Sequence, residues 1–336
     1  MMKITTKRFV ASLILFLLFF SVNAWAGSGD FKQVFTALPG EAVNSTNPLN
    51  DAKVELGKML YFDPRLSKSG FISCSSCHNL ATGGVDNLPT SIGHGWQSGP
   101  RNAPTVLNAA LLGTQFWDGR AADVEEQAGG PILNPGEMGA TEELVLKRIG
   151  SMKAYVELFG KAFKSDKNPL KYENVAKAIA AFERTLLTPS RFDDYLNGDM
   201  GALSASELKG LGIFIDKGCA GCHNGVAVGG NSFQKFNYGD DLGREEVTKD
   251  KSDRRVFRVA SLRNVSVTYP YFHDGKVWDL KEAVMIMGEK QLGVKLTSAE
   301  ADALVSFLGS LTGRLAPVTL PTLPPSNQRT PRPDRG

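Results

Sequence analysis

Cysteine and histidine are scarce in this chain, with four of each among 336 residues. All four cysteines lie in two Cys-x-x-Cys-His blocks, Cys74 with Cys77 before His78, and Cys219 with Cys222 before His223. This spacing is typical of covalent haem attachment, in which two thiols bind the porphyrin and the histidine binds its iron. In an oxidising compartment each cysteine pair could form a disulfide instead, but that leaves both histidines unexplained. The sequence therefore predicts two covalently bound haem c groups.

An excess of charge of either sign is also missing. The predicted leader described below holds Lys3, Lys7 and Arg8 but no acidic residue. Removing it lowers the basic count from 38 to 35, which equals the acidic count. Haem propionates would then make the assembled protein acidic. Because no basic cluster is present, we expect no nucleic-acid partner.

Long apolar runs are absent except near the N-terminus, where Ala11 to Phe20 is too short to span a bilayer comfortably. Basic residues precede this run, and Ala24-Trp25-Ala26 follows it as a small-x-small cleavage pattern. The combination predicts a signal peptide over residues 1–26. A retained membrane anchor is the alternative, which this length and this cleavage site disfavour. Export together with thioether-bound haem predicts the periplasm, with no membrane anchor after cleavage.

The chain has no long alternating strand pattern, and most of its patterned segments have the apolar spacing of helices. Two stretches repeat each other, Arg101 to Arg120 after the first haem block and Arg258 to Lys276 after the second. The sequence thus predicts a mainly α protein with two cytochrome c-like haem domains in tandem, related by internal duplication. The expected divisions are the signal peptide at 1–26, an N-terminal haem domain at 27–188, a C-terminal haem domain at 189–316, and a partly disordered proline-rich tail at 317–336.

Few side chains are available as sixth ligands of the two irons. Met285 and Met287 lie two residues apart on a predicted helix, so they face different sides. A helix end at Gly288 would favour Met287, although both could be core residues. The first half has no equivalent methionine, and its spare histidine, His94, lies between two glycines, where a surface role and a ligand role both stay open. His273 fits better as a buried hydrogen-bonding residue.

Taken together, these features resemble the bacterial dihaem cytochrome c peroxidase family from about Leu56 to Gly313. The most specific stretch runs from Arg101 through Trp117 to Met138. The resemblance implies an enzyme, a periplasmic cytochrome-c peroxidase that reduces hydrogen peroxide to water with electrons from a small carrier. It also implies that the N-terminal haem is the peroxide site and that the C-terminal haem transfers electrons.

The resemblance implies particular roles as well. Gln127 and Glu137 match the distal pair that handles peroxide, and Trp117 matches a tryptophan between the haems. His94 matches a loop histidine that caps the peroxide-site iron in the resting form of many members. Met287 matches the second iron ligand of the C-terminal haem.

Chemistry supports the distal pair independently. A carboxylate in a partly apolar pocket can move protons because burial raises its pKa. A glutamine can orient peroxide through hydrogen bonds but cannot exchange protons. The plain alternatives are a solvated loop for Glu137, an exposed helix position for Gln127 and simple interdomain packing for Trp117.

The same resemblance implies a calcium ion between the domains, bound by the Asn102 side chain and the carbonyls of Thr268 and Pro270. Calcium favours such oxygen ligands. The expected electron donor is a small c-type cytochrome or a blue-copper protein, and a homodimer is expected because family members usually form one.

Two rival functions are weighed against peroxide reduction. Relatives that build a tryptophan-derived quinone have tyrosine where this chain has Met287, so the methionine favours the peroxidase. A dihaem electron-transfer cytochrome without turnover would keep both irons six-coordinate. Such a protein has no use for a distal acid, so Gln127 and Glu137 together disfavour it.

Overall fold

The computed structural model describes residues 31–334, so the predicted signal peptide at 1–26 lies outside the described residues. The helices are α1 (Phe31–Val34), α2 (Asp51–Phe62), α3 (Cys74–Cys77), α4 (Val124–Leu133), α5 (Glu142–Gly150), α6 (Lys153–Ala162), α7 (Tyr172–Glu183), α8 (Arg191–Leu196), α9 (Ala205–Asp216), α10 (Glu245–Thr248), α11 (Leu280–Leu292) and α12 (Ser298–Ser310). Within the described range, the one sheet is the antiparallel pair β1 (Phe233–Lys235) and β2 (Val256–Arg258). The predicted mainly α class is confirmed.

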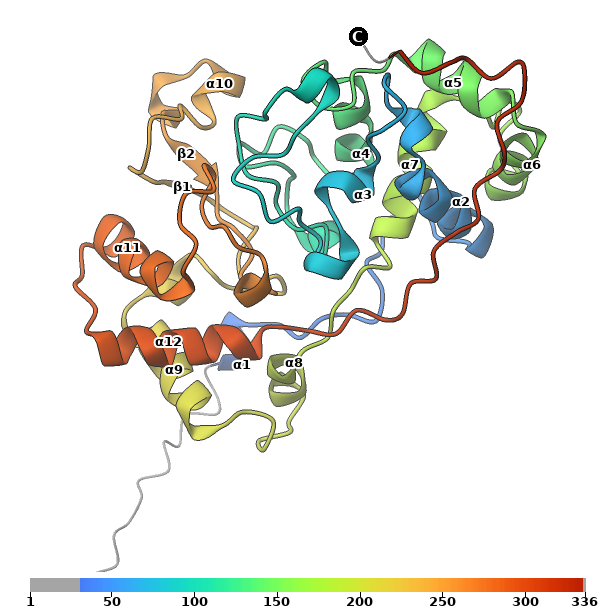
Figure 1. Cartoon of the computed structure of the whole chain (residues 1–336). Helices are drawn as coiled ribbons and strands as arrows, with labels where there is room; N and C mark the ends of the chain where they lie inside the picture. The colour runs from blue at the N-terminus through green and yellow to red at the C-terminus, as the bar shows by residue number, and fades with distance from the viewer. Residues whose placement is uncertain (1–30, 335–336) are drawn as a thin grey trace, which may run out of the picture.

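The first hydrophobic core is formed by α2, α4 and α7, with α5 and α6 packed beside them (Figure 1). Asn50 caps α2 by accepting a hydrogen bond from the Lys53 amide at 2.9 Å. At Gly57 the backbone of α2 approaches α7 so closely that a Cβ atom would lie 1.8 Å from the Ala178 carbonyl oxygen. Only glycine permits this approach, which brings the helix before the first haem block against the domain's central helix.

The second core repeats this arrangement with α9 and α12, which cross at the lower left of Figure 1. A Cβ atom on Gly210 of α9 would lie 2.0 Å from the Ala303 carbonyl oxygen of α12. A capping box begins each of these helices: Ser204 with Glu207 in α9, and Thr297 with Glu300 in α12. The helix that precedes each haem block is therefore held in the same way in both halves.

The two cores divide the chain between Leu186 and Phe192, on either side of the predicted boundary at 188/189. The N-terminal segment, however, crosses over. Phe35, expected in the first domain, packs in the second core and forms a β-bridge with Gly225. Its neighbour Leu38 donates its backbone N–H to the Asp193 carboxylate at 2.8 Å. Residues near the start of the described chain thus belong to the C-terminal core.

The proline-rich tail crosses in the opposite direction, as the red trace of Figure 1 shows. It was expected to be partly disordered, but up to residue 334 it packs specifically on the first domain. The Arg65 guanidinium donates to the Pro324 carbonyl at 2.7 Å, and Arg148 donates to the carbonyls of Pro331 and Arg332 at 3.3 and 3.0 Å. These backbone contacts need no helix or strand, so composition alone does not reveal them.

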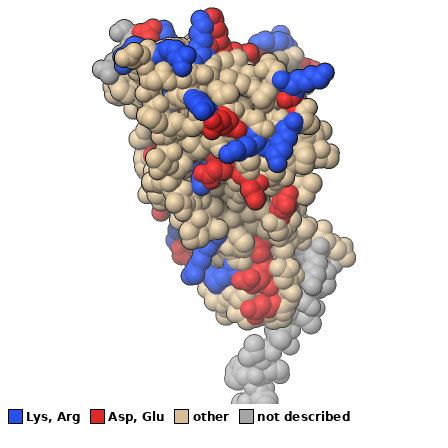
Figure 2. All heavy atoms as spheres, turned by 90° about the vertical axis from the view of Figure 1, so that its right-hand side faces the viewer, with Lys and Arg blue, Asp and Glu red and all other residues tan. Residues whose placement is uncertain are grey.

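The surface that carries α5, α6 and the tail has charges of both signs interspersed (Figure 2). This distribution agrees with the balanced charge expected from the sequence. None of the described helices has the length and apolar character needed to cross a membrane.

Two candidate cofactor cavities

Each half of the described structure contains one large cavity, and each cavity has one Cys-x-x-Cys-His block in its wall. The N-terminal cavity is lined by the Cys74–His78 block and has about 1900 Å³ of open space. The C-terminal cavity is lined by the Cys219–His223 block and has about 1760 Å³. Part of each space is continuous with solvent. Each cavity thus lies beside one pair of cysteines and one histidine, the groups that the sequence predicts for haem attachment.

The histidines of the two blocks are suited to bind a metal. Burial lowers the pKa of His78 and lowers that of His223 to about 4, so both imidazoles are neutral. In His223, Nδ1 lies 3.1 Å from the Ala260 carbonyl oxygen, which leaves Nε2 free as a ligand. Nδ1 of His78 is buried without a partner of normal hydrogen-bond geometry.

The cysteines also fit haem attachment better than thiol redox chemistry. All four are free, and each lines the cavity of its own half. Redox-active Cys-x-x-Cys pairs depend on a lowered thiol pKa. Burial instead raises the pKa of Cys74, Cys77 and Cys219. The donor set of each cavity, two thiols and one neutral imidazole, is that of a covalently bound haem.

Helix α11 contributes Met287 to the wall of the C-terminal cavity, on the same helix face as Ala283 and Val284. Met285 is outside that wall and 43% exposed. The structure therefore distinguishes two methionines that spacing alone barely separated. The sequence predicts a helix end at Gly288, but the helix continues to Leu292.

In the N-terminal cavity the predicted distal pair shares the wall with His78. Gln127 projects from α4, and Glu137 follows it on the turn after the helix. Asn134 shapes this turn, because its side-chain amide donates to Glu137 Oε1 at 2.7 Å. Burial raises the pKa of Glu137, while Arg120 and the Asn134 hydrogen bond oppose the shift. The result is a carboxyl group that can exchange protons nearer to neutral pH.

His94 is the one predicted iron ligand that the structure does not bring to its cavity wall. Its backbone N–H donates to the Glu137 carbonyl at 2.6 Å, and its ring lies against Gly139. The neighbouring Gly93 fits against the Gly136 carbonyl, 1.9 Å from where a Cβ atom would be. The His94 loop is thus attached to the turn that carries Glu137, with the His94 Nδ1 atom buried and unpartnered.

The two cavities share part of their walls. All but one of the shared residues lie between positions 102 and 117, and they are Asn102, Ala103, Pro104, Thr105, Leu112, Trp117 and Arg258. Trp117 is held by a 2.9 Å hydrogen bond from its indole N–H to the Asn102 carbonyl. Its ring centroid lies 6.3 Å from that of His273, which is buried and stacks on Phe257 at 4.3 Å. Trp117 therefore lines both cavities at their shared wall.

The resemblance implies three calcium ligands, and all three line one cavity. Asn102, Thr268 and Pro270 all line the C-terminal cavity. The Asn102 side-chain N–H donates to the Leu88 carbonyl at 2.9 Å, which leaves its amide oxygen available. The described residues contain no group of three or more His, Cys, Asp or Glu side chains placed to hold a metal ion.

Sequence reasoning missed buried charged residues in these walls, among them Arg258 and Glu183. Arg258 is 3% exposed and Glu183 is 5% exposed. Arg258 does have a sequence signal, because it begins the second copy of the repeated element just as Arg101 begins the first. Glu183 has no sequence signal other than being a carboxylate on an otherwise apolar helix face.

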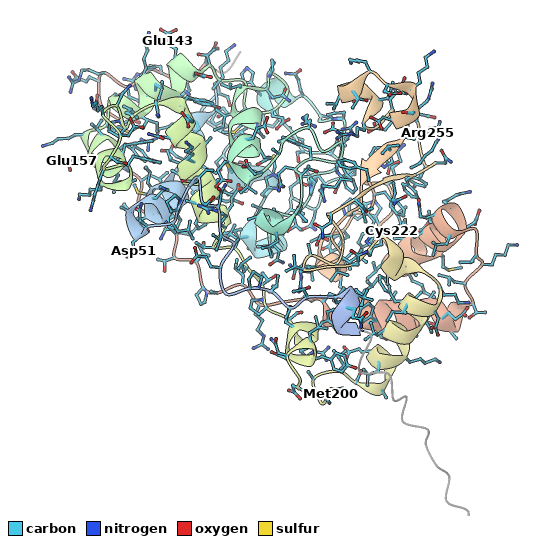
Figure 3. The ribbon with its side chains drawn as sticks, turned by 180° about the vertical axis from the view of Figure 1, so that it is seen from behind. Asp51, Glu143, Glu157, Met200, Cys222 and Arg255 are labelled. Atoms are coloured by element: carbon cyan, nitrogen blue, oxygen red, sulfur yellow. The ribbon has the colours of Figure 1, made fainter. Side chains whose placement is uncertain are left out.

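Figure 3 shows how the halves are separated in space. Cys222 lies with the C-terminal elements, opposite Asp51, Glu143 and Glu157 on the outer helices of the first domain. Cys222 thus belongs to the C-terminal lobe, whereas the first block lines the cavity of the N-terminal half.

Comparison with known proteins identifies similar chains over most of this length. Residues 51–201 match the model of the di-haem cytochrome c peroxidase family, and residues 208–312 match that of cytochrome c. The chain is 52% identical over 297 residues to cytochrome c551 peroxidase of Pseudomonas aeruginosa, covering 85% of this chain and 86% of that protein. It is 51% identical over 302 residues to cytochrome c551 peroxidase of Nitrosomonas europaea, covering 88% and 90%. A solved structure of a MauG-like protein associated with microbial copper homeostasis is 28% identical with a TM-score of 0.75, covering 83% of this chain and 94% of that chain.

Proposed function

Because the chain belongs to the di-haem cytochrome c peroxidase family, we propose that it reduces hydrogen peroxide to two waters with two electrons and two protons. The observation that carries this proposal is the composition of the N-terminal cavity. One wall there combines the neutral imidazole of His78 with Gln127 and Glu137. A binding or electron-transfer protein needs no proton-exchanging carboxyl group beside its iron.

A haem in each cavity would supply iron that accepts and releases single electrons, and in the N-terminal cavity an iron that binds peroxide. His78 would hold that iron. The Glu137 carboxylate accepts the proton of the nearer peroxide oxygen and returns it to the farther oxygen, which leaves as water. The Gln127 side chain makes no hydrogen bond to the described residues, so its amide is free to orient peroxide.

In the C-terminal cavity we assign His223 and Met287 as the two iron ligands, which makes this site one for electron transfer. Trp117 then serves as the aromatic contact between the two sites. A ligand role for His94 requires its loop to leave the position described above, because the ring packs on Gly139 outside the cavity. Family resemblance supports that role.

Further features of the proposal follow from the family and the sequence. Calcium would be bound by the Asn102 amide oxygen and the carbonyls of Thr268 and Pro270, which suit a hard cation. The signal-like N-terminus supports a periplasmic location without a membrane anchor after cleavage. A small c-type cytochrome or a blue-copper protein would deliver the electrons, and the active form would be a homodimer.

Peroxide consumption by the haem-loaded protein tests this function. Wild type should oxidise two molecules of a one-electron donor for each peroxide. Glu137→Ala should lower kcat by about 10²–10⁴-fold, the usual contribution of general acid–base catalysis, with unchanged haem content. Glu143→Ala on the exposed face of α5 is the control and should retain the wild-type rate.

Two results would contradict the proposal. Wild type that transfers electrons but never consumes peroxide would be an electron-transfer cytochrome. Near-normal turnover by Glu137→Ala would remove this residue from the mechanism.

A further inference from the structure

Arg258 occupies an unusual position, because it lines both cavities at once. It is the last residue of β2, where it pairs with Phe233 of β1. Its backbone N–H donates to the Trp117 carbonyl at 2.8 Å. The short sheet therefore fixes this residue beside the tryptophan in the shared wall.

The guanidinium of Arg258 is buried without a carboxylate partner. It donates to the carbonyls of Phe116 and Val259, at 3.1 and 3.3 Å, and makes no ion pair with the described residues. Burial lowers its pKa to about 10, opposed by Asp118, so it remains a cation at neutral pH. A buried unpaired charge costs several kcal/mol unless another group compensates it.

The other cationic side chains in the two walls already have carboxylate partners. Arg101 contacts Asp118 and Asp241 at 2.5 and 2.6 Å, Arg120 contacts Asp118 at 2.9 Å, and Lys217 contacts Glu300 at 2.7 Å. Within the described part of the chain, Arg258 is thus the one cation of these walls left for an incoming anion. A guanidinium has five N–H donors, and two of those in Arg258 are used by the carbonyls above.

The proposed function brings such anions into both cavities, because every haem carries two propionate carboxylates. Guanidinium and carboxylate groups form strong, charge-assisted pairs. We propose that Arg258 binds a cofactor carboxylate from each cavity and thereby couples the charge of the two haem sites. This inference rests on the two-haem function proposed above.

The positive charge of Arg258 would raise the electron affinity of both haems. A fixed positive charge favours the reduced haem, which carries one more electron than the oxidised form. Because Arg258 faces both cavities, removing its charge should lower the reduction potential of both haems. A residue that belonged to one site alone would change only that site.

Spectroscopically monitored redox titration of the haem-loaded protein tests this inference. Arg258→Met and Arg258→Gln are both neutral, and in each the two midpoint potentials should shift to more negative values. Arg258→Lys restores the charge and should recover most of the shift. Arg254→Met, which changes an exposed arginine nearby and outside both walls, should leave both midpoints unchanged.

The inference is overturned if either neutral variant, folded and carrying two haems, shows unchanged midpoints or a shift at one haem only. Two neutral variants are used because Arg258→Met can lose the hydrogen bonds to Phe116 and Val259 that Arg258→Gln can partly keep. Peroxide turnover by wild type is measured separately. If turnover fails, the proposed function is wrong, whereas unchanged midpoints with normal turnover reject only the role of Arg258.

Discussion

At the scale of single residues, the walls of the two cavities contain ionisable side chains that have few partners in the surrounding protein. Glu137 has one polar partner, Arg258 has only carbonyl partners, and the Glu183 carboxylate has no hydrogen-bond partner among the described residues. Such groups cost stability in an ordinary core. Their concentration in two cavities is typical of functional sites.

Glu183 gives a prediction of pH-dependent stability. Burial, followed by repulsion from Glu125 on α4, raises its pKa to about 8. Cys74 on α3 and Tyr61 on α2 also face it, and both are neutral near pH 7. Glu183 is therefore protonated in the folded protein but ionised above a pKa of about 4.3 in the unfolded chain.

The native state thus binds one more proton between about pH 4.5 and 8. Its contribution to stability is complete below the unfolded pKa and is lost as pH rises through 8, with a slope of about 1.4 kcal/mol per pH unit. Urea unfolding of Glu183→Gln should lack this slope, whereas the exposed control Glu157→Gln should keep it. Equal pH dependence in Glu183→Gln and wild type would show that Glu183 is ionised when folded.

At the scale of elements, each half packs the helix that precedes its haem block against a second helix. A glycine in the first helix makes the close contact possible. Gly57 meets Ala178 of α7, and Gly210 meets Ala303 of α12. In both cases the missing Cβ atom lets the backbones touch. The Cys-x-x-Cys-His block after each helix is therefore positioned by a contact that one methyl group would prevent.

Gly57→Ala tests this contact. The added methyl would overlap the Ala178 carbonyl, so α2 and α7 must separate, and we expect a loss of about 1–3 kcal/mol or more, as for other overpacked cores. Gly160→Ala in α6 is the matched control. No atom lies within 4 Å of its Cβ position, so it should stabilise the helix by about 0.5–1 kcal/mol. The free energy of urea unfolding measures both, and a neutral Gly57→Ala would show that the helices are not closely packed.

At the scale of the whole molecule, the two lobes are joined by more than the linker between α7 and α8. The segment around Phe35 packs in the second core, and the tail after α12 returns to the first. In the first domain Arg148 is 1% exposed and bonds to carbonyls of the tail and of Ser67 and Lys68. Lys68 in turn donates its N–H to the Met138 carbonyl at 2.8 Å, next to Glu137.

Removing residues 325–336 tests the importance of the tail. The Arg148 guanidinium would lose the Pro331 and Arg332 carbonyls, and each lost hydrogen bond from a buried charged group costs about 1.5–3 kcal/mol. Thermal unfolding should therefore begin at a lower temperature. Lys147→Ala, on the exposed side of the same helix, is the control. An unchanged melting temperature after truncation would mean that the tail contributes no stability.

The sequence by itself determined the two haem blocks, the helical class and the duplication, because each depends on local spacing. A thiol pair followed by histidine needs no distant partner to be recognised, and capping boxes such as Ser204 with Glu207 act within one turn. The family resemblance supplied Gln127, Glu137 and Trp117, which the structure brings to the cavities.

Only the tertiary structure decided which side chains face the cavities. Met287 and Met285 differ by two positions, and the packing of α11 places one inside and the other outside. The position of His94 depends on its contact with the Glu137 turn, and the order of the tail depends on a buried arginine in another domain. Arg258 lines both cavities only because the two lobes meet. These features arise from contacts between residues far apart in the chain, and such contacts cannot be predicted from a local sequence pattern.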